Sequence, residues 1–189
     1  MIDIDRRHPW LFWPNSICPS FSKKPAADIL KGDQYYKVTF DFLYTEGHKK
    51  DLFAIVPNYT GFSTVDNRVF LGMGCEGGDD WFAVDYYLKP QKRYKLTLEH
   101  KPKESLEVFI NNESIYKTDR HLEVMDNPQM FIGAGYWPDK DEPNRVDFTV
   151  FDIKIENKTE LLAHHTFDNI VHSKSVDKTG NNNFIYQLR

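Results

Sequence analysis

Residues 77–87, Gly-Gly-Asp-Asp-Trp-Phe-Ala-Val-Asp-Tyr-Tyr, combine aromatic rings and carboxylates at a spacing that could recognise a ligand. Successive side chains of an extended strand point to opposite faces. One face then carries Trp81, Ala83, Asp85 and Tyr87, and the other carries Phe82, Val84 and Tyr86. The second face is apolar and typical of a core. The first places flat rings beside a carboxylate.

This pattern suits a sugar, because sugars have apolar C–H faces that stack on rings and hydroxyls that hydrogen bond to carboxylates and amides. The neighbouring Gly-Gly-Asp-Asp segment is expected to form a loop, and the loop at Tyr136 and Trp137 could add a second platform. The predicted ligand-binding residues are Trp81, Asp85, Tyr87, Asp79, Asp80, Tyr136 and Trp137. The alternative is that these aromatic residues pack beneath the N-terminal segment.

A second group of chemically capable residues lies near the C-terminus, at His164, His165, Asp168 and His172. Adjacent strand residues face opposite ways, so His164 and His165 could not bind one ion from a regular strand. The spacing also matches no H-E-x-x-H motif. We therefore expect no zinc site and no catalytic residues here.

The composition argues against several classes of function. The 189 residues include 24 basic and 28 acidic side chains, for a net charge of −4, which lacks the basic footprint of a nucleic-acid-binding protein. No apolar run could span a bilayer, and the N-terminus does not resemble a signal peptide. We expect no nucleic-acid or membrane partner, and a chain that is cytoplasmic or part of a larger protein. Two cysteines, Cys18 and Cys75, do not make a disulfide framework, although one disulfide stays open.

Alternation of apolar and polar residues predicts an all-β chain. In residues 36–44, Tyr-Lys-Val-Thr-Phe-Asp-Phe-Leu-Tyr, Phe40 and Phe42 share a core face while Lys37 and Asp41 face water. Similar patterns predict strands at 51–56, 68–73, 81–88, 94–100, 106–110, 114–118, 129–134, 145–156, 160–166 and 184–188. Asn111 and Asn112 predict a hairpin turn. A change of phase between Val150 and Phe151 predicts a β-bulge.

Many short strands at regular spacing predict a two-sheet antiparallel jelly-roll sandwich. Residues 1–34 differ, because Pro9, Pro14, Pro19 and Pro25 exclude a central strand there and Trp10 and Trp13 argue against a flexible linker. We expect this segment to wrap over a sandwich formed by residues 35–189, in a single domain overall.

Two segments resemble the concanavalin A-like superfamily, in particular domains of the laminin G type. Residues 107–112 (Glu-Val-Phe-Ile-Asn-Asn) are similar to its hairpin strand, residues 131–135 (Phe-Ile-Gly-Ala-Gly) to its glycine segment, and residues 146–155 to its final long strand. The segment at 163–184, with Phe167-Asp168 and Asp177-Lys-Thr-Gly-Asn, resembles an element that usually begins such domains. Here it ends the chain.

The resemblance implies a fold shared by lectins, carbohydrate-binding modules, glycanases and adhesion domains. Glucanases of the superfamily carry E-x-D-x-E on one strand, which this sequence lacks, and Asp147 and Asp152 are spaced for opposite faces of a regular strand. The resemblance also makes a structural calcium ion more plausible than zinc. Its candidate ligands are Asp168, Asp177 and Asn181, or Asp139, Asp141 and Glu142, although acidic loops are usually only solvated.

The sequence therefore predicts a non-catalytic, lectin-like domain that binds an oligo- or polysaccharide, a role that would suit an accessory module of a glycan-processing protein. Two alternatives remain open. One is a glycoside hydrolase or polysaccharide lyase of the jelly-roll fold, and the other is a protein-interaction or assembly domain. The sequence identifies neither the glycan nor the oligomeric state.

Overall fold

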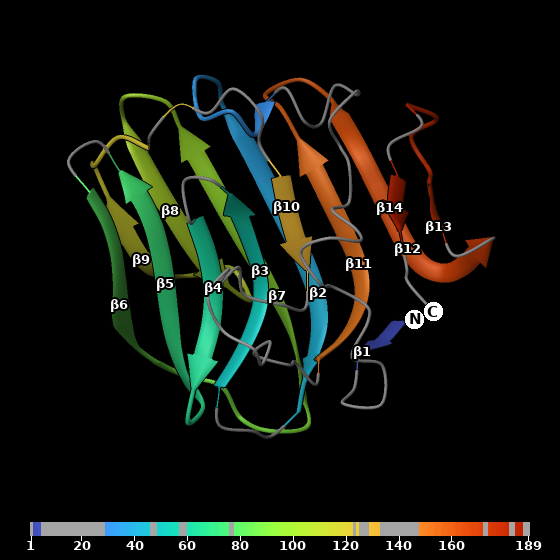
Figure 1. Cartoon of the computed structure of the whole chain (residues 1–189), viewed down its shortest axis with the longest axis horizontal. Helices are drawn as coiled ribbons and strands as arrows, with labels where there is room; N and C mark the ends of the chain where they lie inside the picture. The colour runs from blue at the N-terminus through green and yellow to red at the C-terminus, as the bar shows by residue number, and fades with distance from the viewer. Residues whose placement is uncertain are drawn as a thin grey trace.

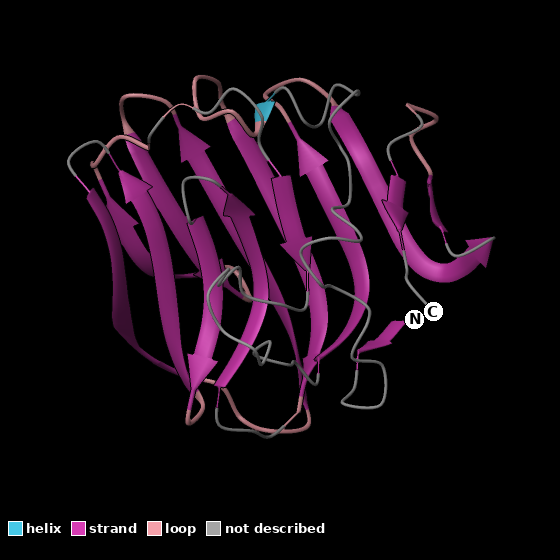
Figure 2. Cartoon of the chain, viewed as in Figure 1, coloured by secondary structure: helices cyan, strands magenta, loops and turns pink. Residues whose placement is uncertain are grey.

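A computed structural model describes residues 2–4, 29–45, 49–56, 60–75, 78–122, 124, 129–132, 148–171, 174–181 and 184–186. Apart from a short helical turn at Ile29, drawn cyan in Figure 2, the regular elements of the described residues are β-strands. The strands form two antiparallel sheets that pack face to face as a jelly-roll sandwich (Figure 1). The predicted fold class is confirmed.

The larger sheet has nine strands, and its continuous order is β14-β13-β12-β11-β2-β7-β8-β9, with β1 pairing with β11. Its strands are β1 (Ile2–Ile4), β2 (Tyr36–Tyr44), β7 (Lys92–Lys101), β8 (Ser105–Ile110), β9 (Glu113–Thr118), β11 (Phe148–Glu156), β12 (Leu161–Val171), β13 (Lys174–Asp177) and β14 (Phe184–Tyr186). The smaller sheet has the order β10-β3-β4-β5-β6. Its strands are β3 (Lys49–Val56), β4 (Thr60–Val65), β5 (Arg68–Cys75), β6 (Gly78–Tyr87) and β10 (Gln129–Ile132).

The core lies between the sheets, where the alternating apolar residues of both sheets meet. Phe42 of β2 lies 6.3 Å from Phe62 of β4, and Phe82 of β6 lies 4.7 Å from Tyr116 of β9, measured between ring centroids. Phe40 and Phe42, which the sequence places on a core face, are both buried, as are Leu96, Leu98 and Val108 of the neighbouring strands. These contacts fix which face of each strand is left for solvent.

The predicted turn and bulge are both present. Asn111 and Asn112 have φ values of 51° and 69°, which Asn adopts more readily than most residues and which match the twist of a hairpin. Strand β11 shifts register against β2 between Val150 and Asp152. Phe151 is the extra residue, and the bulge returns Ile153 to the core side, where it is buried.

Three sequence expectations differ from the structure or lie outside it. Strand β4 was not predicted, because its sequence Thr-Gly-Phe-Ser-Thr-Val is rich in small polar residues. Gly78, Asp79 and Asp80 are not in a loop, since they pair with Cys75, Gly74 and Met73 as the start of β6. Most of the expected wrapping segment, including Cys18 and the prolines, lies outside the described residues, although its first residues form β1 and pair with β11. The division at residue 34 stays a prediction. Ile29 and Leu30, just before it, belong to the core.

Candidate functional site

The predicted binding strand is β6, the edge strand of the five-stranded sheet (Figure 1). It pairs only with β5 in this sheet, where Trp81 lies opposite Gly72, Ala83 opposite Phe70 and Tyr87 opposite Arg68. The register shifts between Arg68 and Phe70, so the three β6 residues from 84 to 86 lie opposite Val69 alone. An irregularity of this kind bends an edge strand and changes where its side chains point.

The side chains of β6 divide between two faces as the sequence predicts. Trp81 is 37% exposed and Tyr87 is 57% exposed, and Asp85 is exposed as well. Val84 is buried, and Phe82 and Tyr86 pack against the core. We call Trp81, Asp85 and Tyr87 the β6 strip. The strip lies outside the inter-sheet core, and each of its two rings is partly exposed to solvent.

The neighbours of the β6 strip leave its two rings in different surroundings. Next to Trp81 the sheet carries Gly72 and then Gly61, so the two positions in register with this ring have no side chain. At the other end, the guanidinium carbon of Arg68 lies 5.9 Å from the centre of the Tyr87 ring, and Arg68 Nε donates to the Val84 carbonyl at 3.1 Å. A cation over a ring face is attracted to it, which helps to hold Tyr87 in place.

The other predicted ligand-binding residues are placed less completely. Asp79 and Asp80 belong to the backbone of β6, directly before Trp81, and their side chains lie outside the described part of the structure. Tyr136 and Trp137 also lie outside it. The structure therefore brings together Trp81, Asp85 and Tyr87 on one strand face and does not test the second aromatic platform.

The histidine pair takes two structural positions on β12. His165 is fully buried opposite Ile153, whereas the neighbouring His164 bonds through Nε2 to Asp152 Oδ2 at 2.6 Å. The two rings therefore lie on opposite faces of the sheet, as the geometry of a regular strand requires. In the described residues, no group of three or more His, Cys, Asp or Glu side chains could hold a metal ion.

Of the calcium candidates, Asp177 and Asn181 form hydrogen bonds within the chain. Asp177 Oδ1 accepts from the backbone nitrogens of His164 at 2.9 Å and Thr179 at 3.0 Å. Asn181 Nδ2 donates to the Leu162 carbonyl at 2.9 Å. Of the others, the structure does not describe the Asp168 side chain or residues 139, 141 and 142. The calcium site stays a prediction.

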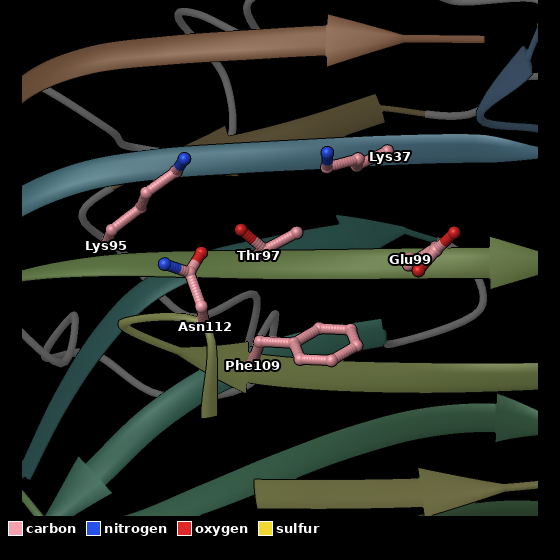
Figure 3. A pocket seen from close by; sticks show the side chains of 6 residues that line it. All are labelled: Lys37, Lys95, Thr97, Glu99, Phe109 and Asn112. Carbon is pink, nitrogen blue, oxygen red and sulfur yellow. The ribbon is translucent and has the colours of Figure 1, made fainter. Parts of the chain in front are cut away.

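A groove that the sequence did not suggest lies on the solvent face of the nine-stranded sheet. It has a volume of about 200 Å³ and is lined by Lys37, Lys95, Thr97, Glu99, Phe109 and Asn112 (Figure 3). We call it the β7 groove, since three of these residues alternate along β7. The alternation was visible in the sequence only as a polar strand face. The other side of the groove is lined by Phe109 of β8 and by Asn112 of the turn. No local sequence pattern shows that these residues lie next to β7.

Comparison with known proteins finds likeness in structure only. No family model matches the chain, and no curated protein matches it. A protein from Bacteroides ovatus, described as a candidate carbohydrate-binding protein, matches with a TM-score of 0.61 and 11% identity over 81% of this chain and 53% of its own. Tailspike protein 2 of bacteriophage CAB120 of Escherichia coli O157:H7 matches with a TM-score of 0.54 and 11% identity over 75% of this chain and 25% of its own.

Sheep galectin-11 also matches, but its TM-score of 0.44, at 14% identity over 65% of this chain and 89% of its own, is too low to support an argument. The chain spans about half the length of the Bacteroides ovatus protein. At such low identities the comparisons establish only the fold, a jelly-roll β-sandwich. The described residues contain no helix that is long and apolar enough to cross a membrane.

Proposed function

We propose that this protein is a non-catalytic carbohydrate-binding domain of the concanavalin A-like, laminin G type, and that its β6 strip contacts the glycan. One observation carries the proposal. Trp81, Asp85 and Tyr87 lie exposed along one face of an edge strand, while Val84 between them is buried. Exposed rings beside a carboxylate can stack on the C–H face of a sugar and accept hydrogen bonds from its hydroxyls.

The shape of the β6 strip favours a linear oligosaccharide over a single sugar. Tyr87 lies six positions after Trp81, so at about 3.3 Å per residue the two Cα atoms are at most about 20 Å apart. A ligand that contacts both rings must therefore extend along the strand. Stacking on one face with few hydrogen bonds gives weak binding, with a Kd roughly in the millimolar to micromolar range.

The proposal is tested by screening a glycan array and titrating the best neutral oligosaccharide by calorimetry. Trp81→Ala and Tyr87→Ala should each weaken binding by at least about tenfold, and Trp81→Ala should leave the circular dichroism spectrum and the melting temperature almost unchanged. Leu161→Ala is the matched control, since Leu161 is an exposed apolar residue at the start of β12, in the other sheet.

Two results would favour the alternatives. Release of shorter products during incubation with oligosaccharides would identify an enzyme of this fold. If no glycan binds but a protein partner is retained through β6, the domain serves assembly, in line with the position of β6 at a sheet edge.

A further inference from the structure

The solvent face of the nine-stranded sheet is covered by ion pairs. Strands β2, β7, β8, β9 and β11 contribute five pairs: Lys37–Glu156 at 3.8 Å, Arg93–Asp41 at 2.6 Å, Lys101–Glu99 at 3.9 Å, Lys117–Glu107 at 3.4 Å and Lys154–Asp152 at 3.7 Å. The carboxylates on this part of the sheet are therefore each beside a cation. A further cation on the same face has none of these five carboxylates to itself, so its charge can attract an anionic ligand.

Lys95 is such a cation. Its partner across the sheet is Asp41, but Arg93 binds that carboxylate with two hydrogen bonds, from Nε to Oδ1 and from Nη2 to Oδ2, both at 2.6 Å. The guanidinium also lies 4.1 Å from the centre of the Phe151 ring, which holds it in place. Within the described part of the chain, the Lys95 ammonium forms no ion pair. Asp41 is thus already satisfied by Arg93, and Lys95 lines the β7 groove.

The other walls of the β7 groove supply the remaining chemistry of a sugar site. Figure 3 shows Lys95 and Asn112 at one end, Glu99 and Lys37 at the other, and the Phe109 ring along one side. Thr97 lies between the two ends and is only 8% exposed. Tyr35 Oη donates to Glu99 Oε1 at 3.0 Å, which fixes one carboxylate oxygen. The groove therefore offers a cation, a carboxylate, an amide and an apolar ring.

The backbone that carries Lys95 and Asn112 is held by the sheet and its turn. The Lys95 backbone nitrogen donates to Asn111 Oδ1 at 2.9 Å, and the Asn111 nitrogen donates to the Lys95 carbonyl at 2.8 Å. This exchange ties the hairpin turn that carries Asn112 to the strand that carries Lys95. Preorganised groups lose less entropy when a ligand binds.

We propose that the β7 groove binds an acidic sugar, a uronic acid whose carboxylate pairs with the Lys95 ammonium. In this arrangement the Asn112 amide donates to the same carboxylate, the apolar face of the sugar ring rests on Phe109, and the hydroxyls hydrogen bond to Glu99 and Thr97. The site goes beyond the proposed function. It lies on the other sheet from the β6 strip, takes a charged ligand, and does not depend on the strip.

The test is a titration of the full chain with D-glucuronate, followed by amide chemical shifts in NMR spectra, with D-glucose and acetate in parallel. Glucuronate should shift amides of β7, β8 and the Asn111-Asn112 turn, and should bind at least about tenfold more tightly than glucose or acetate. Raising the ionic strength from about 0.05 M to about 0.5 M should weaken glucuronate binding, because salt screens the ion pair.

Lys95→Gln should remove the preference for glucuronate over glucose, and Phe109→Ala should weaken both sugars. Lys92→Gln is the matched control, since Lys92 is exposed at the start of the same strand and does not line the groove. Trp81→Ala should leave glucuronate binding unchanged, so the two sites are tested separately.

Three results would overturn the proposal. One is equal binding of glucose and glucuronate, and another is acetate binding as tight as glucuronate, which would reveal an anion site without sugar recognition. The third is glucuronate binding that survives Lys95→Gln but is lost in Trp81→Ala. That last result would place the sugar on the β6 strip and would support the proposed function while excluding the groove.

Discussion

Asp41 shows how a single residue determines the chemistry of a surface. It lies directly across the sheet from Lys95 but bonds to Arg93, which lies opposite Leu43. The planar guanidinium donates two parallel hydrogen bonds to a carboxylate, whereas an ammonium acts as a point charge. Arg93 therefore takes both oxygens of Asp41 and leaves the charge of Lys95 for a ligand.

His165 is a buried histidine whose protonation should affect the stability of the fold. Burial disfavours the imidazolium and lowers the pKa of His165 to about 4, with a smaller opposing effect from the charge of Asp177. In the unfolded chain the pKa of a histidine is near 6.5. Between about pH 6.5 and pH 4 the unfolded chain therefore binds more protons, and stability falls as the pH falls.

We predict that lowering the pH from 7 to 5 costs about 2 kcal/mol of unfolding free energy through His165 alone. In urea denaturation at both pH values, His165→Gln should reduce the loss of stability by about that amount. His121→Gln is the control, because His121 is exposed, and this variant should keep the full loss. An unchanged pH dependence in His165→Gln would show that the buried ring is not the titrating group.

Side-chain faces were predictable from the sequence, but side-chain partners were not. The period of two placed Trp81 and Tyr87 on an exposed face and Val84 in the core, since alternation is a property of the strand itself. Whether Asp41 pairs with Arg93 or with Lys95 depends on the length and geometry of the two side chains, which lie on a neighbouring strand. Because Asp41 pairs with Arg93, Lys95 is left as an unpaired cation beside the β7 groove within the described residues. This pairing is not visible in the sequence, so the sequence did not reveal the site.

The turn after β13 shows how an element can depend on one carboxylate. Asp177 Oδ1 accepts hydrogen bonds from the backbone nitrogens of His164 and Thr179, and from Thr179 Oγ1 at 2.8 Å. The Leu162 carbonyl lies 3.2 Å from Thr179 Oγ1 as an alternative acceptor for the same proton, and Asn181 Nδ2 donates to it at 2.9 Å. The Asp-Lys-Thr-Gly-Asn segment therefore connects the turn to β12, and Gly180 supplies the positive φ of 79° that the turn requires.

We predict that Asp177→Ala lowers the unfolding free energy by about 1–3 kcal/mol, because it leaves buried donors without an acceptor. Asp177→Asn keeps an oxygen in the position of Oδ1 and should lose less. Chemical denaturation of the three proteins measures the difference. Equal stability of Asp177→Ala and the unsubstituted protein would mean that these hydrogen bonds are replaced by water at no cost.

At the scale of the element, strands with strong alternation were predictable and irregular ones were not. Strand β2 matches its predicted bounds, Tyr36–Tyr44, and the bulge in β11 follows from the change of phase at Phe151. Strand β4 was missed because Gly61, Ser63 and Thr64 give it no apolar alternation, although Phe62 anchors it in the core. Glycine and aspartate favour turns, so the sequence predicts a loop at residues 78–80. The structure has a strand there, because pairing with β5 outweighs the low strand propensity of these residues.

In the part of the chain that the structure describes, both sheets contribute to the same core. Phe42 meets Phe62 across the sandwich, and Phe82 meets Tyr116 near the other edge. The β6 strip and the β7 groove lie on opposite outer faces of this sandwich. Each binding surface is thus backed by a sheet whose inner face is fixed by the other sheet.

The last prediction concerns this shared core. Leu71 of β5 is 2% exposed, and Leu71→Ala should lower the unfolding free energy by about 2–5 kcal/mol by creating a cavity. If the sheets unfold together, hydrogen exchange followed by mass spectrometry should show protection in β2 and β7 of the other sheet falling by the same free energy as in β4 and β5. Glu104→Ala, an exposed turn substitution, should leave protection unchanged in every strand. A loss confined to β4 and β5 would show that the five-stranded sheet opens on its own, and that the β6 strip could then be lost while the β7 groove stays intact.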